Sequence, residues 1–317
     1  MKKTGRIIGL TALLAAFALM SLGSGSSSSN TKETKAIAKD NTVSDSASTT
    51  KADSGDKTTE AVSADEKAKE EITIEEQLLL DQNGLKITAK GYTEDPIWGP
   101  GIKLLMENDT DKNLSVSCNA LIVNNYMVND LFAESIAAGK KTNENLYFLS
   151  SDLKNAGIDT PGQIEIYFHV YDSDTYSKVF DADCVTLKTS VYDSMKTVKL
   201  DDGKEIYNED GLRIVGKYVD ENSLWGAAVL LFIENNTGRN VTVQTDDMSI
   251  NGFMVTPLFS STVYDGKMAL DDITIMQSDL EKNDIQSVDE IELKFNIFDP
   301  DTYQTIKNTD TIKFSTK

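Results

Sequence analysis

The sequence predicts an all-β protein, in which two tandem immunoglobulin-like antiparallel β-sandwich domains follow a signal peptide and a disordered linker. Two observations predict this fold. The chain aligns with itself at a shift of 127 residues: between Trp98 and Tyr176, 26 of 79 positions are identical without a gap, so one module occurs twice. Within each module, short apolar stretches alternate with polar residues at the period of a β-strand and are separated by turn residues.

The repeat also divides the chain into segments. A length of 317 residues is typical of about two domains of ordinary size. We expect a signal peptide at 1–23, a disordered linker rich in Ser, Thr, Lys, Asp and Glu at 24–75, a first sandwich at 76–190, a short linker at 191–199 and a second sandwich at 200–317.

The N-terminal segment is typical of an exported protein. Basic residues up to Arg6 precede an apolar run over 7–22, and the small residues Ser21 and Gly23 stand where a signal peptidase would cleave. The apolar run is short for a membrane span, and an uncleaved membrane anchor is the alternative interpretation.

The same segment resembles a bacterial lipoprotein signal. A Leu- and Gly-bearing box that ends at Gly23 is followed by Gly25 and a run of serines. In that family a Cys directly after the box carries the lipid, whereas Ser24 stands at this position here and no Cys occurs before Cys118. We therefore expect no lipid at Ser24, and contact with a membrane only through the N-terminal segment.

The linker is predicted to stay unfolded. Residues 24–71 contain no aromatic side chain and few branched apolar ones, so they cannot bury enough surface to offset the entropy lost on ordering. Such a segment acts as a flexible spacer. The stretch at 60–82 is richer in Ala, Glu, Lys and Leu, and we expect a short helix there.

Each module is predicted to contain seven or eight short antiparallel strands. Strands are predicted at 84–89 and its copy 211–216, at 102–106 and 227–233, at 114–123 and 241–250, at 126–132, at 145–149 and 272–276, and at 164–171 and 291–298. The absence of alternating long helices argues against a parallel α/β fold.

Turn residues define the connections between these strands. The pairs at 124–125 (Asn-Asn) and 251–252 (Asn-Gly) predict type I′ hairpins, because that turn needs positive φ at both central residues. Asp-x-Asp-Thr-Tyr at 172–176 and 299–303 predicts a second tight hairpin in each module. Ser-Asp-Leu at 151–153 predicts the cap and first turn of a short helix.

These features resemble the secreted immunoglobulin-like, telokin-like accessory domains of Gram-positive envelope lipoproteins. The resemblance is carried by the N-terminal strand pair, by the Glu-Asn-x-Thr turns at 107–110 and 234–237, and by the hairpins of Asn124 and Asn251. It covers both modules and implies an immunoglobulin-like fold with a binding or envelope role. The Cys…Trp…Cys frame of antibody domains is absent.

The composition excludes several functions. The chain has 31 Lys and Arg against 51 Asp and Glu, so its formal net charge of −20 repels nucleic acid. It has one His, which makes a His-bearing triad or a multi-His metal centre improbable. Its two Cys cannot build a zinc ribbon or a disulfide-dense scaffold. No catalytic residues are predicted.

Trp98 and Trp225 are the candidate ligand-binding residues. They are the only tryptophans, and they hold the same position in the two modules. If exposed, they could bind a sugar ring or a peptide; if buried, they plug the end of each sandwich. Both interpretations remain open at the level of sequence.

The candidate metal ligands are four aspartates of the second hairpins. Asp172, Asp174, Asp299 and Asp301 could supply oxygen atoms to Ca²⁺, the only cofactor considered. The alternative is that these side chains hydrogen-bond their own turn. Pairing between Cys118 and Cys184 is also open, since their counterparts in the second module are threonines.

We therefore expect a non-enzymatic exported protein of the cell envelope, at the cell surface or secreted, in a Gram-positive bacterium. Its sandwiches would bind, adhere or scaffold, with an envelope protein or glycan as partner. The alternatives are a purely structural spacer and a carbohydrate-active enzyme with an acidic cleft between the modules.

Overall fold

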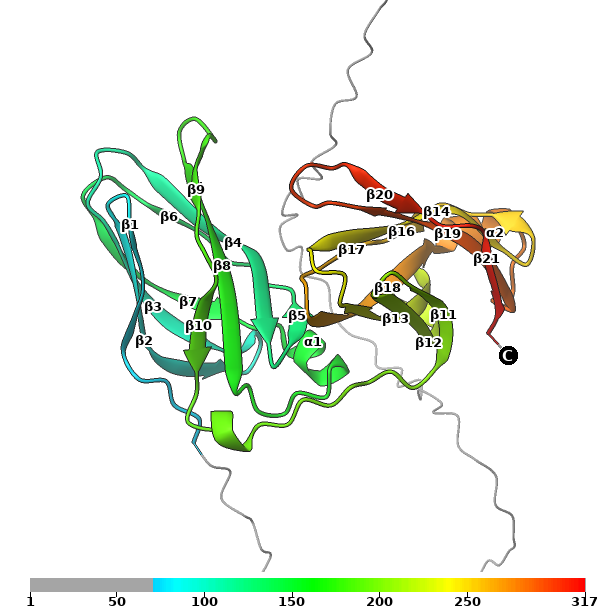
Figure 1. Cartoon of the computed structure of the whole chain (residues 1–317), viewed down its shortest axis with the longest axis horizontal. Coiled ribbons are helices and arrows are strands. Elements are labelled where there is room, and N and C mark those ends of the chain that lie inside the picture. The colour runs from blue at the N-terminus through cyan, green and yellow to red at the C-terminus, as the bar shows by residue number, and fades with distance from the viewer. Residues whose placement is uncertain (1–70, 317) are drawn as a thin grey trace, which may run out of the picture. The chain divides into compact units, whose positions relative to one another are not determined.

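The computed structural model describes residues 71–316, which form an all-β structure of antiparallel sheets (Figure 1). The predicted signal peptide, the lipoprotein-like box and the linker up to residue 70 lie outside the described residues, as does Lys317. None of the helices formed by residues 71–316 is long and apolar enough to cross a membrane.

The first module consists of two packed sheets. Its first sheet is ordered β1 (Gln77–Gln82), β2 (Leu85–Asp95), β3 (Gly99–Asn108) and β7 (Lys141–Tyr147). Its second sheet contains β4 (Leu114–Val123), β5 (Tyr126–Val128), β6 (Ala133–Ile136), β8 (Gln163–Asp172), β9 (Lys178–Asp181) and β10 (Val185–Lys188). The helix α1 (Ser150–Asn155) connects β7 to β8.

The strand order is that of an immunoglobulin-like sandwich. In the first sheet β2 pairs with β3 and β3 pairs with β7, which is the order A-B-E. In the second sheet β10 pairs with β8, β8 with β4 and β4 with β6, which is the order G-F-C-C′. The chain crosses from the first sheet to the second between β3 and β4, as in the Greek-key connection of this fold.

The second module repeats the elements of the first and adds one short strand, β16. It contains β11 (Lys204–Glu209), β12 (Leu212–Ser223), β13 (Gly226–Asn235), β14 (Val241–Ile250), β15 (Phe253–Met254), β16 (Pro257–Leu258), β17 (Ser260–Val263), β18 (Lys267–Met276), α2 (Gln277–Lys282), β19 (Glu290–Phe298), β20 (Thr305–Asn308) and β21 (Ile312–Ser315). The strands β3 and β13, like β4 and β14, begin and end 127 residues apart.

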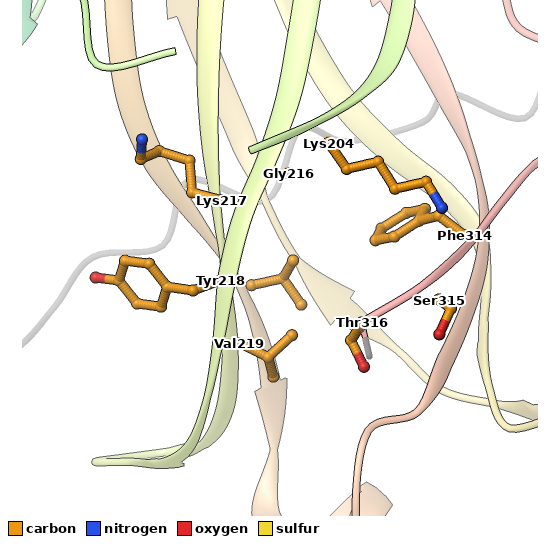
Figure 2. Close-up of a pocket in the computed structure, with 9 residues that line it drawn as sticks. Lys204, Gly216, Lys217, Tyr218, Val219, Phe314, Ser315 and Thr316 are labelled. Atoms are coloured by element: carbon orange, nitrogen blue, oxygen red, sulfur yellow. The ribbon is translucent and has the colours of Figure 1, made fainter. Parts of the chain in front are cut away.

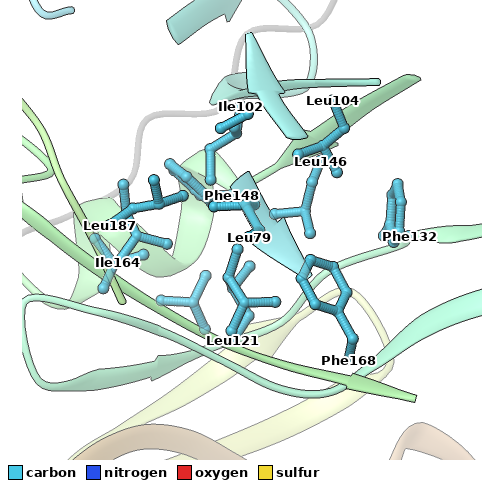
Figure 3. Packing of buried hydrophobic residues seen from close by; sticks show 14 of the residues in the cluster. Leu79, Ile102, Leu104, Leu121, Phe132, Leu146, Phe148, Ile164, Phe168 and Leu187 are labelled. Atoms are coloured by element: carbon cyan, nitrogen blue, oxygen red, sulfur yellow. The ribbon is translucent and has the colours of Figure 1, made fainter. Parts of the chain in front are cut away.

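Each module has its own hydrophobic core between its sheets. In the first, the inward side chains of β3 and β7 pack against those of β4 and β8, as Figure 3 shows for Ile102, Leu146, Leu121 and Phe168. A second cluster fills the other module. The alternation of buried and exposed residues along β19 is the pattern expected where one face of a strand lies on the core.

A buried asparagine braces each core at the same place. Asn108 is completely buried, and its Nδ2 donates to the carbonyl oxygens of Lys112 (2.8 Å) and Ile136 (2.9 Å). Asn235 is equally buried and donates to Arg239 (2.8 Å) and Val263 (2.7 Å). The Glu-Asn-x-Thr motif is thus a structural brace that ties a turn to the strand β6 or β17.

Both predicted types of hairpin are confirmed. Asn124 and Asn125 have φ of 48° and 71°, and Asn251 and Gly252 have φ of 50° and 84°, as a type I′ turn requires. At the second hairpin, the N–H of Tyr176 donates to the carbonyl of Asp172 (2.8 Å).

Two predictions about local structure near the sandwich edges are wrong. The described part of the predicted helix at 60–82 contains no helix: residues 71–76 are irregular, and Gln77–Gln82 forms β1, which pairs with β2. The predicted strand at 126–132 is interrupted after Val128, because the Asp130 carboxylate accepts the N–H of Phe132 (2.9 Å) and turns the chain. The first module accordingly has ten strands, β1 to β10, rather than seven or eight.

The predicted helix at 151–153 exists, but its cap differs from the prediction. The helix α1 begins at Ser150, and the preceding residue, Leu149, makes no side-chain capping bond. The carboxylate of Asp152 instead accepts the N–H of Asn129 (2.8 Å). In the second module Asp279 accepts the N–H of Thr256 (2.7 Å) in the same way. The repeated aspartate therefore anchors the segment after β5 or β15 to the helix.

Candidate functional site

The two tryptophans lie at the tips of equivalent hairpins. Trp98 connects β2 to β3 and Trp225 connects β12 to β13, and their side chains are 47% and 55% exposed. The residue before each is also apolar and more exposed still, with Ile97 at 79% and Leu224 at 87%. Each module therefore presents an aliphatic side chain and an indole to solvent. The indoles do not plug the ends of the sandwiches, which was the alternative interpretation.

Hydrogen bonds to the backbone hold both tips in place. In the first module Oδ1 of Asp95 accepts the N–H groups of Ile97 (2.8 Å) and Trp98 (2.9 Å). In the second, the N–H of Gln277, the first residue of α2, donates to the carbonyl of Trp225 (2.7 Å). The aromatic side chains are thus carried on ordered backbone.

A glycine after each tryptophan lets the strands approach closely. Gly99 and Gly226 have φ of 91° and 142°, in the region that favours glycine. A Cβ at Gly99 would lie 2.2 Å from Oγ of Ser150, and one at Gly226 would lie 2.3 Å from the carbonyl oxygen of Ile275. The close approach of the strands explains the glycine of each Trp-Gly pair. The tryptophan before it lies on the solvent side of the tip.

A pocket of about 310 Å³ adjoins the tip of the first module. Its lining includes Asp95 and Pro100 from the hairpin and Leu153 and Ile158 from the region of α1. Burial, together with the nearby carboxylate of Glu94, raises the pKa of the Tyr92 hydroxyl in this pocket. The tip thus combines an exposed indole with a hollow that is lined by both apolar and charged side chains.

The end of the second module carries further exposed apolar side chains. Phe253 and Met254 of β15 are 49% and 64% exposed, and Leu258 of β16 is 56% exposed. The helix α2 links this strip to the tryptophan tip, because Asn283 donates from Nδ2 to the carbonyl of Met254 (3.4 Å) directly after α2. In the first module, by contrast, Tyr126 is 1% exposed.

Of the four aspartates proposed as calcium ligands, the first of each hairpin, Asp172 or Asp299, binds its own turn, whereas Asp174 accepts a hydrogen bond from Nδ2 of Asn113 (3.2 Å). Oδ1 of Asp172 accepts the N–H groups of Asp174 (3.0 Å) and Thr175 (3.1 Å), and these bonds help to lower its pKa. Oδ1 of Asp299 likewise accepts the N–H groups of Asp301 (3.0 Å) and Thr302 (2.8 Å). Among residues 71–316 no group of three or more His, Cys, Asp and Glu side chains is placed to hold a metal ion.

A second pocket, also of about 310 Å³, is lined by both modules. Cys118 and Asp130 line it from the first module and Asp271 from the second. Burial raises the pKa of the Asp130 and Asp271 carboxyls, the latter to about 6, and raises the pKa of the Cys118 thiol. Cys118 and Cys184 are both free thiols in this structure.

A third pocket, of about 240 Å³, opens at the edge of the second module (Figure 2). Figure 2 shows Val219 and Phe314 on its two sides, while Tyr218 points to the other face of its strand. This volume lies below the roughly 300–1,000 Å³ of ordinary small-molecule sites. The exposed tips therefore remain the stronger candidate.

Comparisons with known proteins give no functional assignment. No family model and no curated protein matches the chain. The SafA pilin in complex with the SafB chaperone of Salmonella enterica aligns over 68% of this chain and 88% of that chain, at 12% identity and a TM-score of 0.21. The YadV chaperone aligns over 66% and 90%, also at 12% identity and a TM-score of 0.21.

A third solved structure, Bacteroides uniformis β-glucuronidase, is similar over 73% of this chain but only 26% of its own length, at 13% identity and a TM-score of 0.21. Likenesses of this size carry no argument about function. The all-β class rests on the strands and pairings of the chain itself.

Proposed function

We propose that this chain is a non-enzymatic binding protein of the bacterial cell envelope, and that its two sandwiches hold a protein partner through their aliphatic–Trp tips. The apolar N-terminal run and the polar linker support export and a surface location. The resemblance to envelope immunoglobulin-like domains supports the same placement.

The observation that carries this proposal is the repetition of an exposed tip. Tryptophan is enriched among the residues that dominate protein interfaces. Here the same aliphatic–Trp pair is exposed in both copies, Ile97–Trp98 and Leu224–Trp225, whereas repeated core positions such as Phe168 and Phe295 are buried. Two linked tips increase affinity for a repeated partner through effective concentration.

The surroundings of the tips favour a protein over a glycan. Sugar rings stack on a flat aromatic face beside polar groups, whereas each indole here follows a highly exposed aliphatic side chain. The nearby carboxylates of Glu94 and Asp95, and of Asp220 and Glu221, make the rim acidic. The complementary partner would offer an apolar pocket bordered by basic residues.

The test compares two pairs of exposed aromatic residues. The chain from Ser24 onward and its Trp98→Ser/Trp225→Ser variant are titrated on envelopes of the encoding bacterium, untreated or digested with protease. The control is Tyr176→Ser/Tyr303→Ser, since these tyrosines are repeated and are 81% and 79% exposed on other hairpins. Thermal melting shows that all three chains are folded.

We expect the tryptophan variant to lose at least about tenfold in affinity, as for an interface hot spot. The tyrosine control should bind as the parent does, and protease treatment of the envelopes should abolish binding. Binding to purified, protein-free cell-wall glycan that depends on the tryptophans would replace the protein partner with a glycan. Unchanged binding by the tryptophan variant would refute the role of the tips.

A structural spacer is the second candidate, because the segment between the modules is held on both sides. The hydroxyl of Tyr126 donates to the carbonyl of Val198 (2.7 Å) and accepts the N–H of Leu200 (3.1 Å). Nζ of Lys217 donates to the carbonyl of Leu200 (2.7 Å). A chain that only spaces an assembly would show no saturable binding in the same titration.

A further inference from the structure

The contact between the two modules uses different surfaces of equivalent domains. The first module contributes β5, where Tyr126 is 1% exposed and Met127 packs against the core of the second module. The second module contributes β18, whose Met268 donates its N–H to the carbonyl of Asn125 (3.0 Å) and forms a parallel bridge with Tyr126. We call these two surfaces the β5 end and the β18 face.

An apolar row and an ion pair complete the β18 face. Val215, Phe232 and Met268 of the second module join the hydrophobic cluster of the first. Nζ of Lys267 lies 2.6 Å from Oε1 of Glu165, and these two side chains are only 15% and 8% exposed. The contact is therefore well packed and electrostatically paired.

Because the modules are copies, the chain has a second β5 end and a second β18 face, and neither has a partner among residues 71–316. The β5 end of the second module consists of Phe253 and Met254, which are 49% and 64% exposed. They are the counterparts of Tyr126 and Met127. A contact between unlike surfaces leaves one surface of each kind free, so the next copy can repeat it and build a ring or an open filament.

The second β18 face lies on the sheet β1-β2-β3-β7 of the first module. Leu105, the counterpart of Phe232, is partly buried there, and Lys141 stands where the other module has Met268. Lys140, the counterpart of Lys267, is exposed and forms no ion pair with a described residue. Lys86, Lys90 and Lys141 also lie on this sheet, where each is paired with a carboxylate of its own module, Asp81, Glu76 and Glu107 respectively. Lys140 therefore supplies the positive charge of this face that an incoming carboxylate can meet.

The changes on the two free surfaces are complementary in charge. Asn119 and Ala120, which line the pocket between the modules, are replaced in the second module by the exposed carboxylates of Asp246 and Asp247. Glu292 replaces Glu165 and keeps its charge. An acidic and apolar β5 end thus complements a β18 face that presents Lys140 and Leu105.

We propose that a second copy of this chain docks its β18 face, at 86–107 and 140–143, onto the β5 end at Phe253 and Met254, so that molecules associate head to tail. Glu292, which is paired with Lys313 at 2.6 Å in the single chain, then also faces Lys140 of the next copy. The contact repeats the internal one, with acid–base pairs in place of part of its apolar surface.

The test uses the chain from Ser24 onward and variants at exposed positions. Phe253→Asp/Met254→Asp removes the β5 end, and Lys140→Glu/Lys141→Glu removes the β18 face. Leu131→Asp is the matched control, since Leu131 is 71% exposed and belongs to neither surface. Sedimentation velocity over a concentration series measures association, and thermal melting verifies folding.

For the parent chain and Leu131→Asp we expect concentration-dependent growth beyond the dimer, and for each surface variant at least about a tenfold weaker association. Mixing the two surface variants should restore dimers and stop there, because each keeps the surface that the other lacks. A parent chain that stays monomeric, or variants that associate like the parent, would overturn the proposal. Dimers that form in Lys140→Glu/Lys141→Glu but not in Phe253→Asp/Met254→Asp would indicate a symmetric contact between two β5 ends instead.

This inference does not depend on the proposed function. Trp225→Ser should leave association unchanged, because Trp98, its counterpart, takes no part in the internal contact. A variant that loses partner binding but still associates with itself bears on the proposed function alone. A variant that loses self-association but still binds the partner bears on this inference alone. Growth that Trp225→Ser abolishes would contradict the placement of the contact on β15.

Discussion

Glu165 and Lys267 belong to different modules, yet Oε1 of one lies 2.6 Å from Nζ of the other, and both side chains are largely buried. Nε2 of Gln163 also donates to Oε1 of Glu165 (2.7 Å), and Nζ of Lys267 also donates to Oδ1 of Asn125 (3.3 Å). A buried pair of this kind is costly to break, because the remaining charge is left without compensation. The pair therefore couples the two modules.

Lys267→Met should destabilise the protein by about 3 kcal/mol, since it leaves the Glu165 carboxylate buried and unpaired. Glu165→Gln added to Lys267→Met should recover part of this loss. Urea denaturation followed by circular dichroism measures the free energy of unfolding.

The control for this ion pair is Lys140→Met at the equivalent, exposed position of the first module. An exposed substitution of this kind changes the free energy of unfolding by no more than about 0.5 kcal/mol. Equal effects at the two positions would show that the internal contact contributes nothing to stability.

Asn108→Ala and Asn235→Ala should each cost about 2–4 kcal/mol, because each leaves buried carbonyl groups without a donor. The two losses should be similar, since the two side chains have the same partners in their own modules. Asn143→Ala, on the exposed face of β7, is the control and should be nearly neutral. Thermal or urea unfolding measures all three, and a neutral Asn108→Ala would contradict the brace.

What the sequence predicted correctly depends on local chemistry. The type I′ turns follow from Asn and Gly residues that tolerate positive φ, and 114–123 is a strand because its apolar residues are bounded by turn residues. The repeat then transfers each assignment to the other module. The all-β class follows from these short-range signals together.

What the sequence could not predict depends on contacts between distant residues. Asn108 reaches the carbonyl of Ile136, and nothing in the Glu-Asn-x-Thr motif identifies that partner. Lys140 and Lys267 are the same residue at the same repeat position, but only Lys267 meets a carboxylate of the other module. The exposure of Trp98 was open for the same reason, since packing around a tip is not encoded in its own residues.

Asp271→Asn should stabilise the protein at pH 7 and remove part of its pH dependence. Burial, with the charges of Asp152 and Asp272, raises the pKa of the Asp271 carboxyl from 3.8 to about 6. Between these values the unfolded chain loses its proton before the folded chain does. The contribution of Asp271 to stability therefore falls as pH rises from about 4 to about 6 and is constant above that.

The measurement is the difference in free energy of unfolding between parent and Asp271→Asn from pH 4 to pH 8. We expect the variant to gain about 1–3 kcal/mol relative to the parent over this range. The carboxyls of Asp130 and Glu134 also have raised pKa values and cancel in this difference. A difference that does not vary with pH would show that Asp271 is not the titrating group.

Gly226→Ala should both destabilise the second module and displace the indole of Trp225. The backbone at Gly226 has φ of 142°, and a Cβ there would lie 2.3 Å from the carbonyl oxygen of Ile275, so β13 and β18 must separate. Gly238→Ala is the matched control, because Gly238 also has positive φ, 81°, but a Cβ there meets nothing within 4 Å. The control isolates the cost of positive φ, about 1 kcal/mol.

Both substitutions are made in a Trp98→Phe background, so that fluorescence reports on Trp225 alone. We expect Gly226→Ala to cost at least about 2 kcal/mol more than Gly238→Ala and to shift the emission of Trp225, whereas Gly238→Ala leaves the emission unchanged. Equal losses, with no shift in emission, would mean that the close approach of β13 and β18 does not position the tip. The glycine after each tryptophan would then not be explained by the close approach of the two strands.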